Sequence, residues 1–453
     1  MGFDDRHNVP ALRRRALSPS AWCVVAAFGT YFCMYAFRKP FTAGTYVEPW
    51  LGGAGFKSIL VIAQVLGYTL SKFIGIKVVA EIGPRRRAIL VLVLIGCAEL
   101  ALLLFAVTPA PFNVLWLFAN GVPLGMVFGL VLRFLEGRRH TEALVAGLCT
   151  SFIMADGVTK STGAALLQSG VTESWMPFSA GLLFVPPLLL FVWMLSRVPA
   201  PSQWDVAARS ERTPMTGMER RTFFQRYALG LTLLVLVYLL ITILRSVRAD
   251  FAPEIWAGLQ KSVRPDVFTW SETAVAAGVL LVNGSVVFIK DNRHAFFTGL
   301  GLALAGTFLI GFTLMGLSAG VLSPFAFMVL HGLGLYMPYI AVNTTIFERL
   351  IAMTRDRGNI GYLMYLADAF GYLGYALVLV VRNLHPSTEE FLTYFIALSW
   401  VVTGACAVLL LPCWRYFATN PATRSVSNLP TPTLGEAVEV VPLSATWRAD
   451  ERR

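Results

Sequence analysis

The sequence predicts an all-α integral membrane protein in which twelve transmembrane helices form two pseudo-symmetric six-helix bundles. Of the 453 residues, 56% are hydrophobic and only 14% are charged, a balance that no soluble domain of this length needs for its core. Apolar stretches long enough to cross a bilayer core of about 30 Å recur along the chain. Charged residues recur at matching places in the two halves of the sequence.

A membrane-spanning helix needs about 20 mostly apolar residues. Applied in order along the chain, this criterion predicts spans near residues 20–48, 56–80, 88–107, 112–135, 143–167, 175–196, 227–256, 267–289, 294–316, 322–347, 358–382 and 390–414. The first span follows three arginines and resembles a signal peptide, but it is long and lacks a clear cleavage site, so we expect it to be retained. Pro40 and Pro253 predict bends in the first and seventh spans.

The composition between and after the spans predicts the domain organisation. Residues 1–196 would form the N-terminal six-helix bundle and residues 227–415 the C-terminal bundle. Residues 197–226 contain prolines and several arginines and would form a cytoplasmic linker. Residues 416–453 are polar and rich in Pro, Thr and Ser, which is typical of a disordered cytoplasmic tail.

The distribution of basic residues predicts the orientation in the membrane. Most of the 37 Lys and Arg residues fall in the segments that share a side with the two termini, whereas the opposite loops hold only Lys57, Lys261, Arg264 and Arg382. Cytoplasmic loops carry this excess, so both termini should be cytoplasmic in a multi-pass protein of the cell (inner or plasma) membrane. The net charge of +11 therefore reflects topology, and we expect no nucleic-acid partner.

Six basic residues fall inside predicted spans: Arg38, Lys39, Lys72, Lys160, Arg245 and Arg248. A charge deep in hydrocarbon costs about 2.5 to 3.5 kcal/mol on insertion scales. The sequence separation between Arg38 and Arg245 is close to that between Asp156 and Asp368, which indicates an internal repeat that carries charged residues. This repeat favours an anion site, although the arginines could instead point to the membrane surface or pair with the two aspartates.

Two six-helix halves in parallel orientation resemble the major facilitator superfamily, whose site lies between the halves near mid-membrane. Within it, four segments are similar to the organophosphate:phosphate antiporters, which transport glycerol 3-phosphate and hexose phosphates. These are Tyr35-x-x-Arg38-Lys39-x-Phe41, Tyr68-Thr69-Leu70-Ser71-Lys72-Phe73, Arg245 followed by Asp250-Phe251-Ala252-Pro253, and Phe370-Gly371-Tyr372-Leu373-Gly374. The resemblance covers nearly the whole chain except the tail.

The resemblance implies that Arg38 and Arg245 hold a phosphate group from the two halves, with Lys72 as a further cationic contact. Their chemistry suits the task, because a guanidinium stays charged and binds phosphate oxygens in a bidentate manner, whereas Lys supplies a point charge. Tyr35 and Tyr68 are candidate lining residues of the same cavity.

The chain departs from the antiporter pattern in helices five and eleven. Asp156 aligns where the family carries a substrate-contacting histidine, and its repeat mate Asp368 is also unlike the family. Asp156 and Lys160 lie four residues apart on one helix face and can neutralise each other. Alternatively, an aspartate in this setting can carry a proton. Ion pairing and proton coupling both remain open.

We therefore expect a secondary active transporter of a small organic anion. The resemblance implies a phosphorylated metabolite exchanged for phosphate, and coupling to protons is the open alternative. A transporter-like sensor that binds an anion without moving it, and a proton-coupled transporter of a neutral solute, are the rival interpretations. No motif indicates an enzyme, a cofactor or a metal site, and we expect a monomer in the lipid bilayer.

Overall fold

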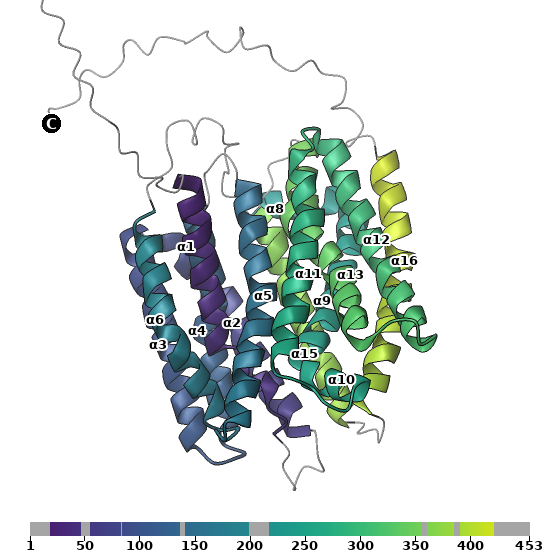
Figure 1. Cartoon of the computed structure of the whole chain (residues 1–453). Helices are drawn as coiled ribbons and strands as arrows, with labels where there is room; N and C mark the ends of the chain where they lie inside the picture. Colours follow the sequence, from purple (N-terminus) through teal and green to yellow (C-terminus); the bar gives the residue numbers. More distant parts are fainter. Residues whose placement is uncertain are drawn as a thin grey trace, which may run out of the picture.

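A computed structural model describes residues 19–46, 55–82, 84–135, 141–198, 217–354, 360–384 and 390–420. These residues form helices and no strands (Figure 1). The terminal face is the side at which α1 begins and α16 ends, and it lies at the top of Figure 1. The other side is the opposite face.

The N-terminal half contains six long helices, which correspond to the first six predicted spans. They are α1 (Pro19–Met34), α2 (Gly55–Glu81), α3 (Pro84–Val107), α4 (Val114–Leu135), α5 (Thr141–Gln168) and α6 (Met176–Ser196). Two short 3-10 segments, η1 (Tyr35–Phe37) and η2 (Pro40–Ala43), follow α1.

The C-terminal half contains the other six spans together with several shorter segments. The long helices are α9 (Ala228–Asp250), α11 (Asp266–Ser285), α12 (Asn292–Ser318), α13 (Pro324–Ala341), α15 (Ile360–Leu384) and α16 (Phe391–Thr419). The shorter ones are α8 (Gly217–Arg226), α10 (Ala252–Leu259), the 3-10 turn η4 (Val286–Phe288), the π-helical turn η5 (Val342–Ile346) and α14 (Phe347–Thr354).

Length and composition support the membrane assignment. Among the described residues, nine helices are long and apolar enough to cross a bilayer, and α1 is a shorter apolar helix. The long helices α5 and α15 occupy the remaining two predicted spans. Large apolar side chains such as Leu281, Phe312 and Val401 are exposed on the outside, as lipid contact requires. The predicted all-α membrane fold is confirmed.

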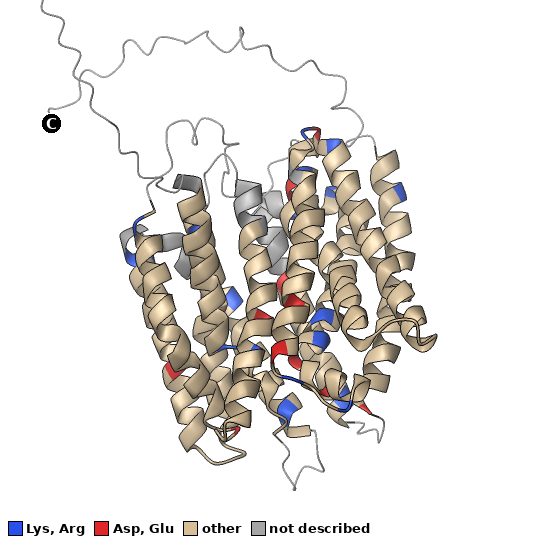
Figure 2. Ribbon diagram, viewed as in Figure 1, with Lys and Arg blue, Asp and Glu red and all other residues tan. Residues whose placement is uncertain are grey.

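The two halves meet along two pairs of helices. The helices α5 and α11 run side by side, and α2 packs against α15 (Figure 1). Figure 2 shows charged residues at helix ends and a further group in the middle of the bundle, around α5, α9 and α11. Because charges inside a bilayer are expensive, this internal group marks the region that needs a functional explanation.

Helix breaks distinguish the first and seventh spans from the continuous helices predicted there. The first span is helical only to Met34 and continues in 3-10 turns, and α9 ends at Asp250 before α10 begins. Pro40 and Pro253 lie in the first turn of the new segments, where proline needs no N–H partner. The bends predicted from the prolines are therefore present, but as breaks.

Two predicted boundaries also differ from the structure. The last part of the predicted linker is helical, because α8 begins at residue 217, and α16 continues to residue 419, past the predicted start of the tail at 416. Residues 199–216 and 421–453 lie outside the described residues, so most of the linker and tail predictions remain predictions.

Candidate functional site

Arg38 and Arg245 line the same small internal cavity, which has a volume of about 10 Å³. Arg38 lies at the break between η1 and η2, and Arg245 lies in the C-terminal part of the unbroken α9, five residues before its end. The two residues are 5% and 8% exposed, so neither reaches for the membrane surface. Each half of the molecule thus contributes one buried guanidinium to one cavity.

Aromatic rings, not carboxylates, surround the two guanidinium groups. The Cζ atom of Arg38 lies 3.9 Å from the ring centroid of Tyr68, and that of Arg245 lies 4.5 Å from the ring centroid of Tyr339. Within the described residues neither arginine has a carboxylate oxygen within 4.0 Å, and the buried Nε atom of each has no hydrogen-bond partner. The alternative in which the arginines pair with Asp156 and Asp368 is therefore not what the structure shows.

The acidic residues of the cavity are paired with lysines. Asp156 forms an ion pair with Lys160, one helical turn later on α5. Asp250 forms an ion pair with Lys39 and accepts a hydrogen bond of 2.9 Å from the hydroxyl of Tyr375. Lys39 Nζ also lies 3.9 Å from Asp156 Oδ1. Two lysines thus balance two aspartates, and the charges of the two arginines remain uncompensated in this part of the structure.

Lys72 and Asp368 lie outside the lining of this cavity and contact each other. Lys72 Nζ is 2.9 Å from Asp368 Oδ2, and the hydroxyl of Tyr238 donates a hydrogen bond to Asp368 Oδ1. The pair joins α2 to α15, one helical turn closer to the terminal face than Tyr68 and Tyr372. Sequence reasoning singled out both residues but could not pair them, because no spacing rule relates side chains on opposite halves.

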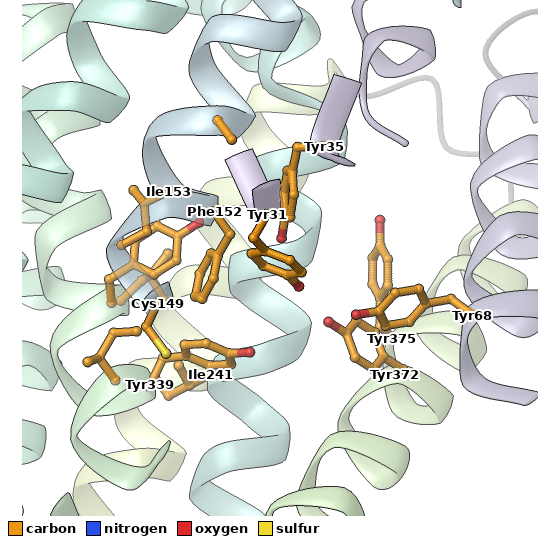
Figure 3. Packing of buried hydrophobic residues seen from close by; sticks show 14 of the residues in the cluster. Tyr31, Tyr35, Tyr68, Cys149, Phe152, Ile153, Ile241, Tyr339, Tyr372 and Tyr375 are labelled. Carbon is orange, nitrogen blue, oxygen red and sulfur yellow. The ribbon is translucent and has the colours of Figure 1, made fainter. Parts of the chain in front are cut away.

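Tyrosines supply most of the remaining polar surface of the site. Tyr35 lines the cavity, as do Tyr336, Tyr372 and Tyr375, which the sequence analysis did not select. Tyr68 instead packs beneath Arg38 and meets Tyr372 with ring centroids 5.3 Å apart. In Figure 3 the hydroxyl groups of Tyr31 and Tyr35 face those of Tyr68 and Tyr372. Only Tyr372 belonged to a segment quoted above, and nothing in the sequence distinguished the others from packing aromatics.

A further ion pair joins the halves near the opposite face. Lys57 Nζ lies 2.6 Å from Glu254 Oε1 of α10 and donates a hydrogen bond of 2.8 Å to the carbonyl oxygen of Thr42. The sequence analysis placed Lys57 in an outer loop, but it belongs to α2 and is buried. Lys57 lies in the first turn of α2, and its ammonium group is buried because it contacts Glu254 of the other half and the carbonyl oxygen of Thr42.

Residues 40–420 match the model of a family described as a family of unknown function, DUF5690. The chain belongs to this family. No curated protein matches the sequence. Among solved structures, this protein is similar to the crystal structure of a D-xylose-proton symporter, with a TM-score of 0.57 and 14% sequence identity. The match covers 89% of this chain and 98% of the symporter chain.

This likeness concerns the fold. It confirms the major facilitator architecture predicted from the repeat, and the position of the cavity between the halves agrees with that architecture. Within the described ranges no three His, Cys, Asp or Glu side chains are grouped so that they could hold a metal ion.

Proposed function

We propose that this membrane protein is a secondary transporter of a small organic anion, which binds between Arg38 and Arg245 and crosses the membrane by alternating access. The observation that carries the proposal is a pair of buried guanidinium groups, one from each half, that line one cavity. Among the described residues, neither guanidinium group has a carboxylate oxygen within 4.0 Å. The two-half fold supports a transport cycle in which each half moves as a unit.

Electrostatics explains why an anion suits this cavity. Two like charges in a poorly solvated space repel each other. In addition, each ion that is buried without a partner costs on the order of several kcal/mol, because it loses its hydration. An anion that contacts both guanidinium groups relieves the repulsion and supplies the missing hydrogen-bond acceptors. Its binding energy then draws the two halves together.

The polarity of the cavity lining supports a small, oxygen-rich solute. The lining combines the two guanidinium groups with tyrosine hydroxyls, and both are donors to oxygen acceptors. The segments 35–41 and 68–73 resemble segments of the organophosphate:phosphate antiporters. This resemblance supports a phosphorylated metabolite that is exchanged for phosphate. Coupling to protons through the carboxyl group of Asp156 or Asp250 is the alternative energy source.

Reconstituted vesicles test the proposal. Liposomes loaded with inorganic phosphate should take up labelled phosphate by exchange, and unlabelled phosphorylated sugars or carboxylates that are substrates should compete. Arg38→Gln and Arg245→Gln should each abolish exchange while the protein remains folded. Binding of phosphate without exchange would indicate the sensor, and neither binding nor exchange with any of these anions would overturn the proposal.

A proton-coupled transporter of a neutral solute is the second candidate. It is favoured by the fold likeness to a D-xylose-proton symporter and by the buried carboxyl groups of Asp156 and Asp250 beside tyrosine hydroxyls. This candidate predicts uptake of an uncharged solute that is driven by a pH gradient and unaffected by phosphate. Competition by phosphate separates it from the anion transporter.

A further inference from the structure

The break that carries Arg38 leaves backbone carbonyl groups without their helical partners. In a continuous helix the N–H of Thr42 would donate to the carbonyl oxygen of Arg38, but here it donates to that of Lys39, at 3.0 Å. The N–H groups of Arg38 and Lys39 both donate to the carbonyl oxygen of Tyr35. A carbonyl buried in a membrane protein needs another donor, because an unsatisfied one is costly there.

Two buried side-chain amides supply those donors. Gln64 Nε2 donates to the carbonyl oxygen of Arg38 at 3.0 Å, and Asn120 Nδ2 donates to that of Phe37 at 3.0 Å. The amides also bond to each other, with Gln64 Nε2 2.8 Å from Asn120 Oδ1. Asn120 Nδ2 makes one further bond, of 3.0 Å, to the carbonyl oxygen of Ala98 on α3. The network therefore links α2, α3 and α4 to the two residues at the break.

The packing of α2 against α4 brings these amides within reach of each other. Gly121 follows Asn120, and a Cβ atom at this position would collide with the backbone carbonyl oxygen of Gln64. A Cβ atom on Gly125, one turn later, would lie 2.7 Å from the carbonyl oxygen of Tyr68. Small residues permit such close helix contact in membranes. Gln64 and Asn120 thus lie on a rigid pair of helices.

The arrangement is confined to one half of the repeat. The repeat counterpart of Asn120 is His331, whose Nε2 lies 3.2 Å from the hydroxyl of Ser399 on α16. Arg245 lies within a continuous helix and needs no such support. The amide pair therefore accompanies the broken helix, and not the fold as a whole.

We propose that Gln64 and Asn120 are positioning residues that hold the break in the first span and so fix the place of Arg38 in the anion site. Both are almost fully buried, and both act through the backbone of the segment that presents the guanidinium. The proposal rests on the proposed anion function. It adds that the affinity of the site depends on amides that do not line the cavity.

A double-mutant cycle with inorganic phosphate tests this role. Asn120→Leu keeps the side-chain size but removes both donated bonds. We expect it to lower phosphate affinity about tenfold, which corresponds to about 1.4 kcal/mol. In an Arg38→Lys background, where the fork geometry is already lost, Asn120→Leu should cost little more. In an Arg245→Lys background, Asn120→Leu should still lower phosphate affinity by the full factor of about ten. Equal losses in all backgrounds would show a general structural role and overturn the proposal.

Hydrogen–deuterium exchange of the backbone provides a readout that needs no ligand. Asn120→Leu and Gln64→Met should raise exchange in residues 35–43, because local opening becomes easier when the carbonyl contacts are lost. Asn283→Leu is the matched control, since Asn283 is a buried amide of α11 that bonds only within its own helix among the described residues. Exchange in residues 35–43 that does not change in Asn120→Leu would overturn the proposal. Raised exchange in a protein that binds no anion would instead refute the proposed function and leave the amide contacts in place.

Discussion

At the residue scale, Arg38 and Arg245 differ from the other buried cations in what compensates their charge. The other five buried basic residues in the part of the chain that the structure describes each lie within 4.0 Å of a carboxylate: Lys39, Lys57, Lys72, Lys160 and Arg248. The guanidinium groups of Arg38 and Arg245 instead lie over the aromatic rings of tyrosines. A cation–π contact is worth about 0.5 to 2 kcal/mol, which is less than the cost of burying an unpaired charge. The remaining deficit is what a bound anion would supply.

Replacing either arginine by lysine tests the guanidinium geometry. Arg38→Lys and Arg245→Lys retain the charge but lose the planar fork, so each should lower anion affinity at least about tenfold. Arg248→Lys is the control, because Arg248 is buried against Glu272 and does not line the cavity. Titration calorimetry with inorganic phosphate measures the three variants. Equal affinity in Arg38→Lys and the wild type would remove the bidentate contact from the account.

Arg248 itself should matter for stability. Its Nη2 atom lies 2.8 Å from Glu272 Oε1 and donates to the carbonyl oxygen of Met328 at 2.9 Å. Arg248→Met leaves Glu272 buried without its partner, which costs about 3 to 5 kcal/mol for a buried pair. The thermal unfolding midpoint in detergent should therefore fall, and Arg248→Met combined with Glu272→Leu should recover part of the loss. No change in the midpoint of Arg248→Met would contradict this role.

The sequence identified the charged residues well, because charge is expensive in hydrocarbon and therefore visible against an apolar background. It did not identify their partners. Among the buried ion pairs of the described residues, only the Asp156 and Lys160 contact follows a local spacing rule, whereas Lys39 and Asp250 come from different halves. Gln64, Tyr336 and Tyr375 were missed because uncharged polar and aromatic residues are common in membrane helices.

At the element scale, the spans follow from apolar length alone and the breaks do not. The sequence predicts the first span as one helix, but in the structure the helix is broken at Arg38, which lines the anion site. Pro40 signalled a bend, and the amide contacts that stabilise the break come from α2 and α4. The π-helical turn η5 had no sequence signal that we recognised, although such turns are frequent at functional sites.

Close packing of α2 and α4 gives a sharp test at this scale. Gly121→Ala places a methyl group against the backbone of Gln64, and such overpacking typically costs about 1 to 3 kcal/mol. Gly96→Ala is the matched control in the same bundle, because a Cβ atom there meets nothing within 4 Å. Thermal unfolding in detergent should show a loss for the first variant and none for the second. Equal midpoints would mean that the two helices do not pack as described.

At the scale of the whole molecule, ion pairs join the two halves on both sides of the cavity. Lys57 and Glu254 lie toward the opposite face, and Lys72 and Asp368 lie toward the terminal face. A transporter must break one set of contacts at a time, so these pairs bias which side is accessible. The repeat in the sequence revealed that two halves exist, but the contacts between them depend on packing that the repeat does not encode.

Removing the pair on the opposite face should shift this bias. In a chain whose six native cysteines are replaced, Ser246→Cys places a thiol in the cavity lining. Lys57→Met should increase its reaction with a membrane-impermeant thiol reagent added from the opposite face. The charge swap Lys57→Glu with Glu254→Lys restores an ion pair and should return the rate toward its original value. A rate unaffected by Lys57→Met would show that this contact does not control access.

The most direct test of the central claim is a calorimetric titration of the purified protein with inorganic phosphate, phosphorylated sugars and carboxylates. The account predicts that one of these anions binds with a stoichiometry of one per chain. It also predicts that Arg38→Gln and Arg245→Gln each abolish this binding without unfolding the protein. Anion binding that survives both substitutions, or saturable binding of a neutral solute with no anion binding at all, would contradict it.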